Sequence, residues 1–146
     1  MKKAFLFSLL LLVIIGSCTK EKESPLKGAW KLAYEYTESG GKLTTIYPGT
    51  FTGSEIKMWS EHNFIFVGRF KQDSTFTDSF GGGTYKLEGN RYEETVEYHI
   101  SPDYLGKKVK LLLELKSDTI IQSWPVDDNG RLAKSEYSIE KWVRIK

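Results

Sequence analysis

The chain has 146 residues, enough for one domain with its own hydrophobic core. Its 21 basic and 19 acidic side chains give a net charge of only +2, which excludes the strongly basic surface expected of a nucleic-acid-binding protein. The single cysteine, Cys18, excludes an intramolecular disulfide.

The chain begins with the pattern of a bacterial export signal. Lys2 and Lys3 precede an apolar run at residues 4–15, which is too short to span a bilayer as a helix. The sequence IGSC at residues 15–18 then resembles the lipobox of bacterial lipoproteins. This resemblance implies cleavage before Cys18 and a lipid on its sulfur, with palmitate as the expected acyl chain. An ordinary secretory signal with an incidental cysteine is the alternative.

The sequence therefore divides into a signal peptide at residues 1–17, a lipidated cysteine with a short tether at 18–25, and a folded domain at 26–146. The tether is expected to be flexible because it is polar, charged and ends in proline. Its acidic residues Glu21 and Glu23 would alternatively suit a sorting signal. Anchoring makes a membrane the first expected partner, and places the protein in the cell envelope of a Gram-negative bacterium, at the outer membrane.

From residue 26 onward the sequence shows no helical period. Short runs rich in aromatic and β-branched residues are separated by Gly, Asn, Asp and Pro, which predicts an all-β domain. Eight strands are predicted, at 28–37, 54–60, 63–70, 82–87, 91–100, 108–116, 119–126 and 136–145, with a shorter ninth at 74–79. The pair Asn129-Gly130 gives the strongest hairpin signal.

Alternation along each run assigns side chains to an inner or an outer face. The first predicted strand turns four residues inward: Trp30, Leu32, Tyr34 and Tyr36. The fifth turns five inward, and leaves His99 outside: Tyr92, Glu94, Val96, Tyr98 and Ile100. Because most connections are short, the strands should pair as an antiparallel meander, which removes its free edges by closing into a single up-and-down β-barrel. A β-sandwich of similar strand count is the alternative.

Several motifs support the barrel through a family resemblance. Gly28-Ala29-Trp30 is similar to the Gly-x-Trp motif of lipocalins, and Arg144 is placed like the arginine that packs across that tryptophan. The runs at 80–85, 92–95 and 140–144 resemble lipocalin-like domains, many of unknown function, on lipoproteins of Gram-negative bacteria. The resemblance implies a calycin-type barrel with an interior cavity. It does not specify a ligand, because this fold binds very different cargo.

The first expected function is binding of a small, mostly apolar ligand inside the barrel. The expected wall residues are aromatic: Trp30, Tyr34, Tyr36, Phe64, Phe66, Tyr98 and Trp124. The expected polar anchors are Glu94, Gln122 and Arg144. The alternative is a filled barrel whose outer surface docks another envelope protein. The run at 63–70, apolar on both faces, fits either an exterior patch or a ligand wall.

Two of the polar anchors allow two roles each. A buried carboxylate at Glu94 either orients a ligand's hydroxyl or amine, or pairs with an inward cation such as Arg69 or Arg144. Arg144 either stacks on Trp30 or turns inward to bind a carboxylate.

The sequence contains no convincing catalytic or metal-binding constellation. His62 and His99 lie far apart without ligand spacing. Residues 60–62 (Ser-Glu-His) are neighbours on an extended chain, so they point in different directions and do not make a triad. The glycines at 81–83 precede no helix that could bind phosphate, and predict a bulge or a tight corner at the rim of the barrel instead. We therefore expect a non-enzymatic protein without a cofactor.

Overall fold

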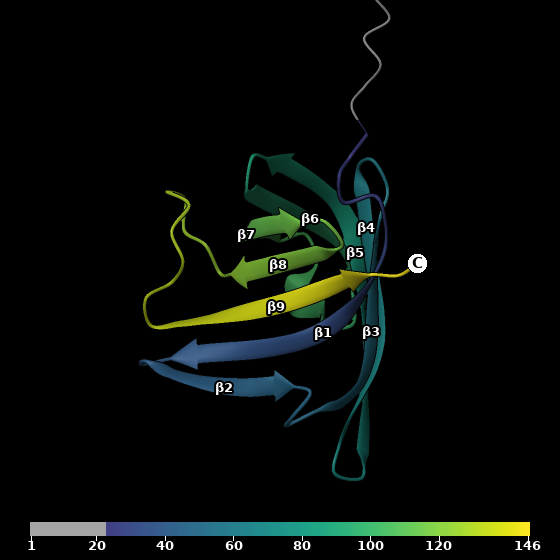
Figure 1. Ribbon diagram of the computed structural model, residues 1–146, viewed down its shortest axis with the longest axis vertical. Coiled ribbons are helices and arrows are strands. Elements are labelled where there is room, and N and C mark those ends of the chain that lie inside the picture. The colour runs from purple at the N-terminus through teal and green to yellow at the C-terminus, as the bar shows by residue number, and fades with distance from the viewer. Residues whose placement is uncertain (1–22) are drawn as a thin grey trace, which may run out of the picture.

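Nine strands and one 3₁₀ turn make up the described part of the computed structural model, residues 23–146 (Figure 1). The predicted signal peptide and Cys18 lie outside the described residues. Within 23–146, no helix is long and apolar enough to cross a lipid bilayer. The elements follow in chain order: β1 (Gly28–Ser39), β2 (Lys42–Tyr47), β3 (Thr52–Trp59), β4 (Asn63–Gln72), β5 (Thr75–Glu88), β6 (Arg91–His99), η1 (Pro102–Tyr104), β7 (Lys108–Lys116), β8 (Thr119–Trp124) and β9 (Glu136–Arg144).

All strands of the described chain except β2 close into an antiparallel barrel. Strand β1 closes it, because residues 28–31 pair with β3 along one edge while residues 30–39 pair with β9 along the other. Strands β3 to β9 pair in chain order between them. The predicted all-β, up-and-down barrel of eight strands is confirmed, and the sandwich alternative is excluded.

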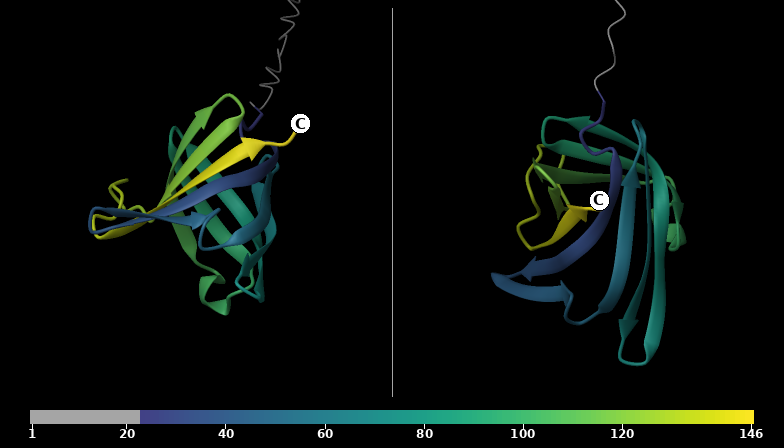
Figure 2. Two further views of the ribbon diagram at one scale, coloured as in Figure 1. Left: turned by 60° about the horizontal axis from the view of Figure 1, so that its bottom comes forward. Right: turned by 45° about the vertical axis from the view of Figure 1, so that its right-hand side comes forward.

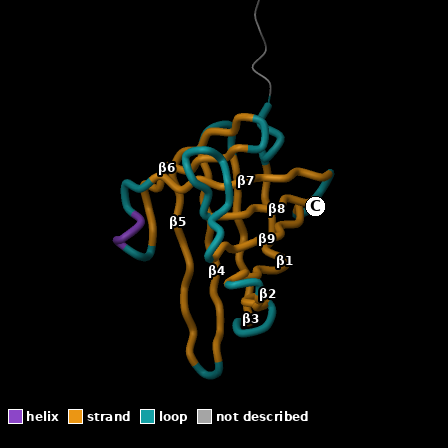
Figure 3. Tube along the Cα trace, turned by 90° about the vertical axis from the view of Figure 1, so that its left-hand side faces the viewer, coloured by secondary structure: helices purple, strands orange, loops and turns teal. Residues whose placement is uncertain are grey.

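Two strand assignments differ from the prediction. Strand β2 was not predicted. It pairs with residues 35–39 of β1, beyond the point where β3 leaves that edge, so β2, the end of β1 and the start of β9 project from the barrel together (Figure 2). The runs at 74–79 and 82–87, predicted as separate strands, belong to the single strand β5. With β4 it forms a long hairpin whose tip extends past the rest of the barrel (Figure 3).

One end of the barrel, here called the closed end, is filled by three tryptophans. Trp30 has 0% of its surface exposed, and its indole lies edge-on to Trp59 at 6.3 Å between ring centroids. Trp59 makes the same kind of contact with Trp142 at 6.4 Å. The indole nitrogen of Trp30 donates to the carbonyl of Leu26 at 2.7 Å, and that of Trp59 donates to the Tyr92 hydroxyl at 2.7 Å. The closed end is therefore packed and its indole donors are satisfied.

Arg144 covers the closed end from outside. Its guanidinium carbon lies 4.0 Å from the centre of the Trp30 ring, and it donates to the carbonyls of Lys27 and Pro25 at 2.7 and 3.2 Å. Gly28 has φ of +125°, and a Cβ there would lie 2.8 Å from an Arg144 nitrogen. Of the two roles left open for Arg144, the structure shows stacking on Trp30.

Two β-bulges reverse the side-chain alternation toward the other end, here called the mouth. In the β1–β9 pairing, Leu32 lies opposite Trp142 and Tyr34 opposite Lys141, so Ala33 is the extra residue. Glu35 consequently turns inward. The predicted inward positions of Tyr34 and Tyr36 are wrong, because both now follow the outward alternation of their partners Lys141 and Ile139.

The second bulge lies in β6. Gly82 pairs with Tyr98 and Gly83 with Val96, which leaves Glu97 as the extra residue. Of the bulge and the tight corner expected at the glycine run, the structure has a bulge, with its extra residue on the strand opposite the glycines. Tyr98 is therefore turned outward with 69% of its surface exposed, and His99 is turned inward. The prediction had these two residues reversed, because it carried one alternation through the whole strand.

Candidate functional site

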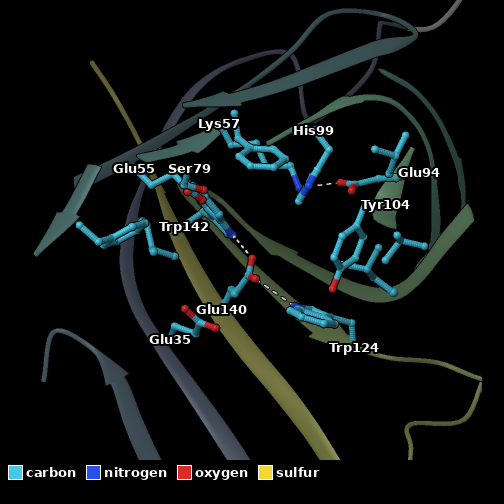
Figure 4. Close-up of a pocket in the computed structure, with 16 residues that line it drawn as sticks. Glu35, Glu55, Lys57, Ser79, Glu94, His99, Tyr104, Trp124, Glu140 and Trp142 are labelled. Carbon is cyan, nitrogen blue, oxygen red and sulfur yellow. Dashed lines mark hydrogen bonds and ion pairs between the residues drawn. The ribbon is translucent and has the colours of Figure 1, made fainter. Parts of the chain in front are cut away.

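A cavity of about 270 Å³ lies inside the barrel between the closed end and the mouth (Figure 4). Every barrel strand contributes to its wall, and η1 adds Tyr104. Sixteen of the described residues line it: Leu32, Glu35, Glu55, Lys57, Phe66, Phe70, Ser79, Glu94, Val96, His99, Tyr104, Val109, Leu111, Trp124, Glu140 and Trp142. The wall thus combines aromatic rings with an unusual number of carboxylates.

A buried ion pair forms the floor of the cavity. Lys57 and Glu94 are 5% and 6% exposed, and the Lys57 ammonium lies 2.6 Å from a Glu94 oxygen. The same ammonium lies 5.1 Å from the Trp59 ring centre and within 6 Å of four more rings. A charge removed from water needs such a partner to be tolerated. Glu94 therefore has the structural pairing that was one of its two expected roles.

The partner of Glu94 differs from both candidates named from the sequence. Arg69 forms an exposed, two-bond pair with Asp78 instead, at 2.5 and 3.1 Å. Arg144 is held at the closed end. Lys57 was overlooked because β3 has inverted polarity: Glu55, Lys57 and Trp59 face inward, whereas Ile56 and Met58 face outward. Lys57 lies two residues before Trp59, and therefore on the same face of the strand. This spacing was the one feature of the sequence that could have placed Lys57 inside the barrel.

Gln122 completes the floor. It is fully buried on the inner face of β8, and its carbonyl oxygen lies 3.5 Å from the Lys57 ammonium. Its amide nitrogen has no hydrogen-bond acceptor among the described residues. A buried donor left without a partner is uncommon in folded proteins and destabilises the floor.

Glu140 lies between two indoles in the cavity wall. One of its carboxylate oxygens accepts from Trp124 at 2.9 Å and the other from Trp142 at 3.0 Å (Figure 4). Burial raises its pKa, while Lys57 and the two indole donors act in the opposite direction. Glu140 therefore fixes the orientation of both rings.

Glu35 and Glu55 are the other two carboxylates of the wall. Burial raises the pKa of Glu35 to about 7, with further increases from the negative charges of Glu140 and Glu55. Burial also raises the pKa of Glu55, against a hydrogen bond from Ser79. No described residue donates a hydrogen bond to Glu35. Perturbed carboxyl groups gathered in a cavity are typical of functional sites, although ion networks can produce them too.

The residues predicted to bind a ligand fall into three groups. Phe66, Glu94 and Trp124 line the cavity. The second group is buried or held at the floor and closed end, out of reach of the cavity: Trp30, Phe64, Gln122 and Arg144. The third group faces outward: Tyr34, Tyr36 and Tyr98. The sequence prediction missed most of the polar wall, including Glu35, Glu55, His99 and Glu140, because bulges and inverted strands decide which side these residues face.

The sequence was compared with known proteins. Residues 25–146 match the protein family described as Domain of unknown function (DUF4488). The chain belongs to this family. No curated protein matches the sequence. The DUF4488 domain and its closed eight-stranded barrel fit a calycin-like fold, in agreement with the coarser part of the resemblance seen in the sequence.

The outer surface of this DUF4488 barrel carries an apolar patch across β3 to β6. Five exposed side chains make it up, with 39–69% of their surfaces accessible: Met58, Ile65, Val67, Phe80 and Tyr98. Met58 pairs with Ile65, and Val67 with Phe80, so the side chains are neighbours on one face. The run at 63–70 thus supplies both an interior wall, through Phe66, and an exterior patch.

Residues 23–146 contain no group of three His, Cys, Asp or Glu placed to bind a metal ion.

Proposed function

We propose that this domain is a non-enzymatic binding protein that holds one small organic molecule in the cavity of its barrel. The observation that carries the proposal is a cavity to which every barrel strand contributes, above a closed end that is fully packed. Its volume of about 270 Å³ lies just below the range of about 300–1,000 Å³ typical of small-molecule sites, which favours a fragment-sized ligand. Phe66, Phe70 and Trp124 supply apolar surface for its body.

Native mass spectrometry of protein purified gently from its own cells tests this function. The expected result is an additional small mass that is lost on denaturation. Val109→Phe, which places a larger side chain in the cavity wall, should abolish the additional mass. Val67→Phe makes the same change on the outer surface, and should retain it. A wild-type protein that carries no molecule and changes neither mass nor tryptophan fluorescence with any small molecule would contradict the proposal.

We further propose that Cys18 anchors the domain to a membrane of the cell envelope. The support is the lipobox-like sequence that precedes the domain. Cys18→Ala should move the protein from the membrane fraction to the soluble fraction, whereas Ser17→Ala, which retains a small residue before the cysteine, should not. Retention of the Cys18→Ala variant in the membrane fraction would contradict the anchor.

Docking of another envelope protein is the second candidate function, and the outer apolar patch favours it. If docking is the function, cross-linking in intact cells should give a discrete complex of this protein with its partner, and the complex should disappear in an Ile65→Lys variant. The same variant should keep its small molecule if the cavity is the functional site.

A further inference from the structure

We infer that the ligand is a small organic cation, an amine with an apolar body, whose ammonium group lies among Glu35, Glu55 and Glu140. This inference rests on the proposed function, because it names the chemical class that the same cavity would take.

The first argument is the charge balance of the wall. Four carboxylates and one lysine line the cavity within the described chain, and the lysine is paired with Glu94 at 2.6 Å. Glu35, Glu55 and Glu140 have no cation of residues 23–146 within ion-pair distance. Burial disfavours the charged forms of all three, and Glu140 adds repulsion at Glu35 and Glu55, against the attraction of Lys57 for Glu55 and Glu140. A cation that enters between them therefore adds the attraction that these carboxylates lack. A neutral ligand leaves this imbalance in place, and an anion increases it.

The second argument is the position of the carboxylates. Glu35 lies directly opposite Glu140 in the β1–β9 pairing, and β3, which carries Glu55, pairs with the other edge of β1. Figure 4 shows Glu35 beside Glu140 at one side of the cavity. Three carboxylates on three adjacent strands thus face a single space.

The third argument is the aromatic surface beside these carboxylates. The indoles of Trp124 and Trp142 are fixed by their bonds to Glu140. Indole faces attract cations as well as apolar groups, and this attraction grows when the cation is desolvated. The wall already holds one ammonium in this way, because the Lys57 nitrogen lies within 6 Å of five rings. The ligand's ammonium would have the same kind of surroundings.

An independent observation is the unsatisfied donor of Gln122. This fully buried amide lies on the inner face of β8, directly across from Glu140 in the β8–β9 pairing. Its nitrogen has no acceptor among the described residues. This buried donor, beside Glu140 in the wall, is a second sign that the protein's own groups do not satisfy this part of the interior.

The test uses three matched probes at pH 8: phenethylamine, 2-phenylethanol and phenylacetate. They share a phenyl ring and a short chain, and differ in being cationic, neutral or anionic. Isothermal titration of the full chain should give an affinity for phenethylamine about tenfold or more above that for 2-phenylethanol, as expected for one charge-assisted hydrogen bond. Phenylacetate should show no binding.

Isosteric variants assign the effect to the carboxylates. Glu35→Gln and Glu140→Gln should each weaken phenethylamine binding by about fivefold to tenfold, and leave 2-phenylethanol binding unchanged. Glu136→Gln is the matched control, because Glu136 lies on the same strand as Glu140 but is exposed. Glu35→Gln keeps the test valid if Glu140→Gln does not fold, since Glu35 accepts no hydrogen bond within the described chain.

The outcomes separate this inference from the proposed function. Equal affinities for the amine and the alcohol, or tighter binding of phenylacetate, would overturn the cation while leaving small-molecule binding intact. Equal loss of the amine and the alcohol in Glu35→Gln would also overturn it, because a merely structural role changes both. Failure of all three probes, together with native spectra free of any bound molecule, would overturn the proposed function as well.

Discussion

The closed end and the mouth of this barrel are built from the same strands with opposite physical chemistry. At the closed end, Trp30, Trp59 and Trp142 pack edge to face, and the indoles of Trp30 and Trp59 donate hydrogen bonds to buried partners. At the mouth, two bulges turn Glu35 and His99 inward around a cavity. Strand β9, for example, supplies Arg144 to the closed end and Glu140 to the cavity wall. Stability and binding are thus separated along the barrel axis.

The largest expected effect is at the closed end. Trp30→Ala removes a fully buried indole, its hydrogen bond to Leu26 and the surface on which Arg144 stacks. The free energy of unfolding should fall by about 3–5 kcal/mol. Chemical denaturation followed by circular dichroism measures it. A loss below about 1 kcal/mol would show that the closed end does not carry the stability assigned to it.

Arg144→Ala should have the next largest effect, a loss of about 2 kcal/mol in the same measurement. The substitution removes the stacking on Trp30 and two charge-assisted hydrogen bonds to the carbonyls of Lys27 and Pro25. Arg69→Ala is the control, because the exposed pair with Asp78 contributes at most about 1 kcal/mol. Equal losses in the two variants would contradict a special role for Arg144.

Trp124→Ala makes the tryptophan-to-alanine change at the mouth. Here the expected loss of stability is only about 1 kcal/mol, chiefly the hydrogen bond to Glu140, because the ring lines a cavity instead of filling a core. Binding of phenethylamine should fall severalfold, as measured by titration. If this variant loses as much stability as Trp30→Ala, the two ends do not differ as described.

The smallest expected effect has the opposite sign. Because the pKa of Glu35 is raised to about 7 in the folded chain from an ordinary value of 4.5, the folded state holds this proton more tightly than the unfolded state. Stability should therefore fall as pH rises from about 4.5 through 7. The groups that face Glu35 are Glu140 on β9 and Glu55 on β3, both of which act in the same direction.

Glu35→Gln removes the part of this pH dependence that comes from Glu35. The melting temperature of the variant should exceed that of the wild-type chain by about 3–5 °C at pH 8 and match it near pH 4.5. Thermal unfolding followed by circular dichroism at both pH values measures the difference. Parallel pH profiles for the two chains would show that Glu35 titrates normally.

The closed end could be predicted from the sequence far better than the mouth. Gly28 and Trp30 lie at the start of β1 and Arg144 at the end of β9, where one uninterrupted alternation suffices to place them. Each bulge shifts the alternation by one residue at Ala33 and Glu97, and neither residue marks its position by type. The errors at Tyr34, Tyr36 and Tyr98 all follow from these two insertions.

Strand β2 and the inward face of β3 could not be predicted from the sequence for a different reason. The first four residues of β2 are exposed, so the strand has hydrogen bonds to β1 but little buried surface to give it a pattern. In β3 the inward Lys57 is stabilised by Glu94, which comes from a strand 37 residues away in sequence. A pairing of this kind forms only in the assembled barrel, so no pattern in the neighbouring sequence predicts it.

The chain joins the barrel at its packed end, and this sets a direction for the whole molecule. Ser24 is held by Glu61 and Tyr85, and the fully buried Leu26 accepts a hydrogen bond from Trp30 through its carbonyl oxygen. Ser24 follows Cys18 by six positions, a distance of at most about 21 Å for a fully extended chain. If Cys18 carries lipid as proposed, the tryptophan-packed base rests toward the bilayer and the acidic opening points away from it. Cargo would then be exchanged with the surrounding fluid and not with the lipid beneath.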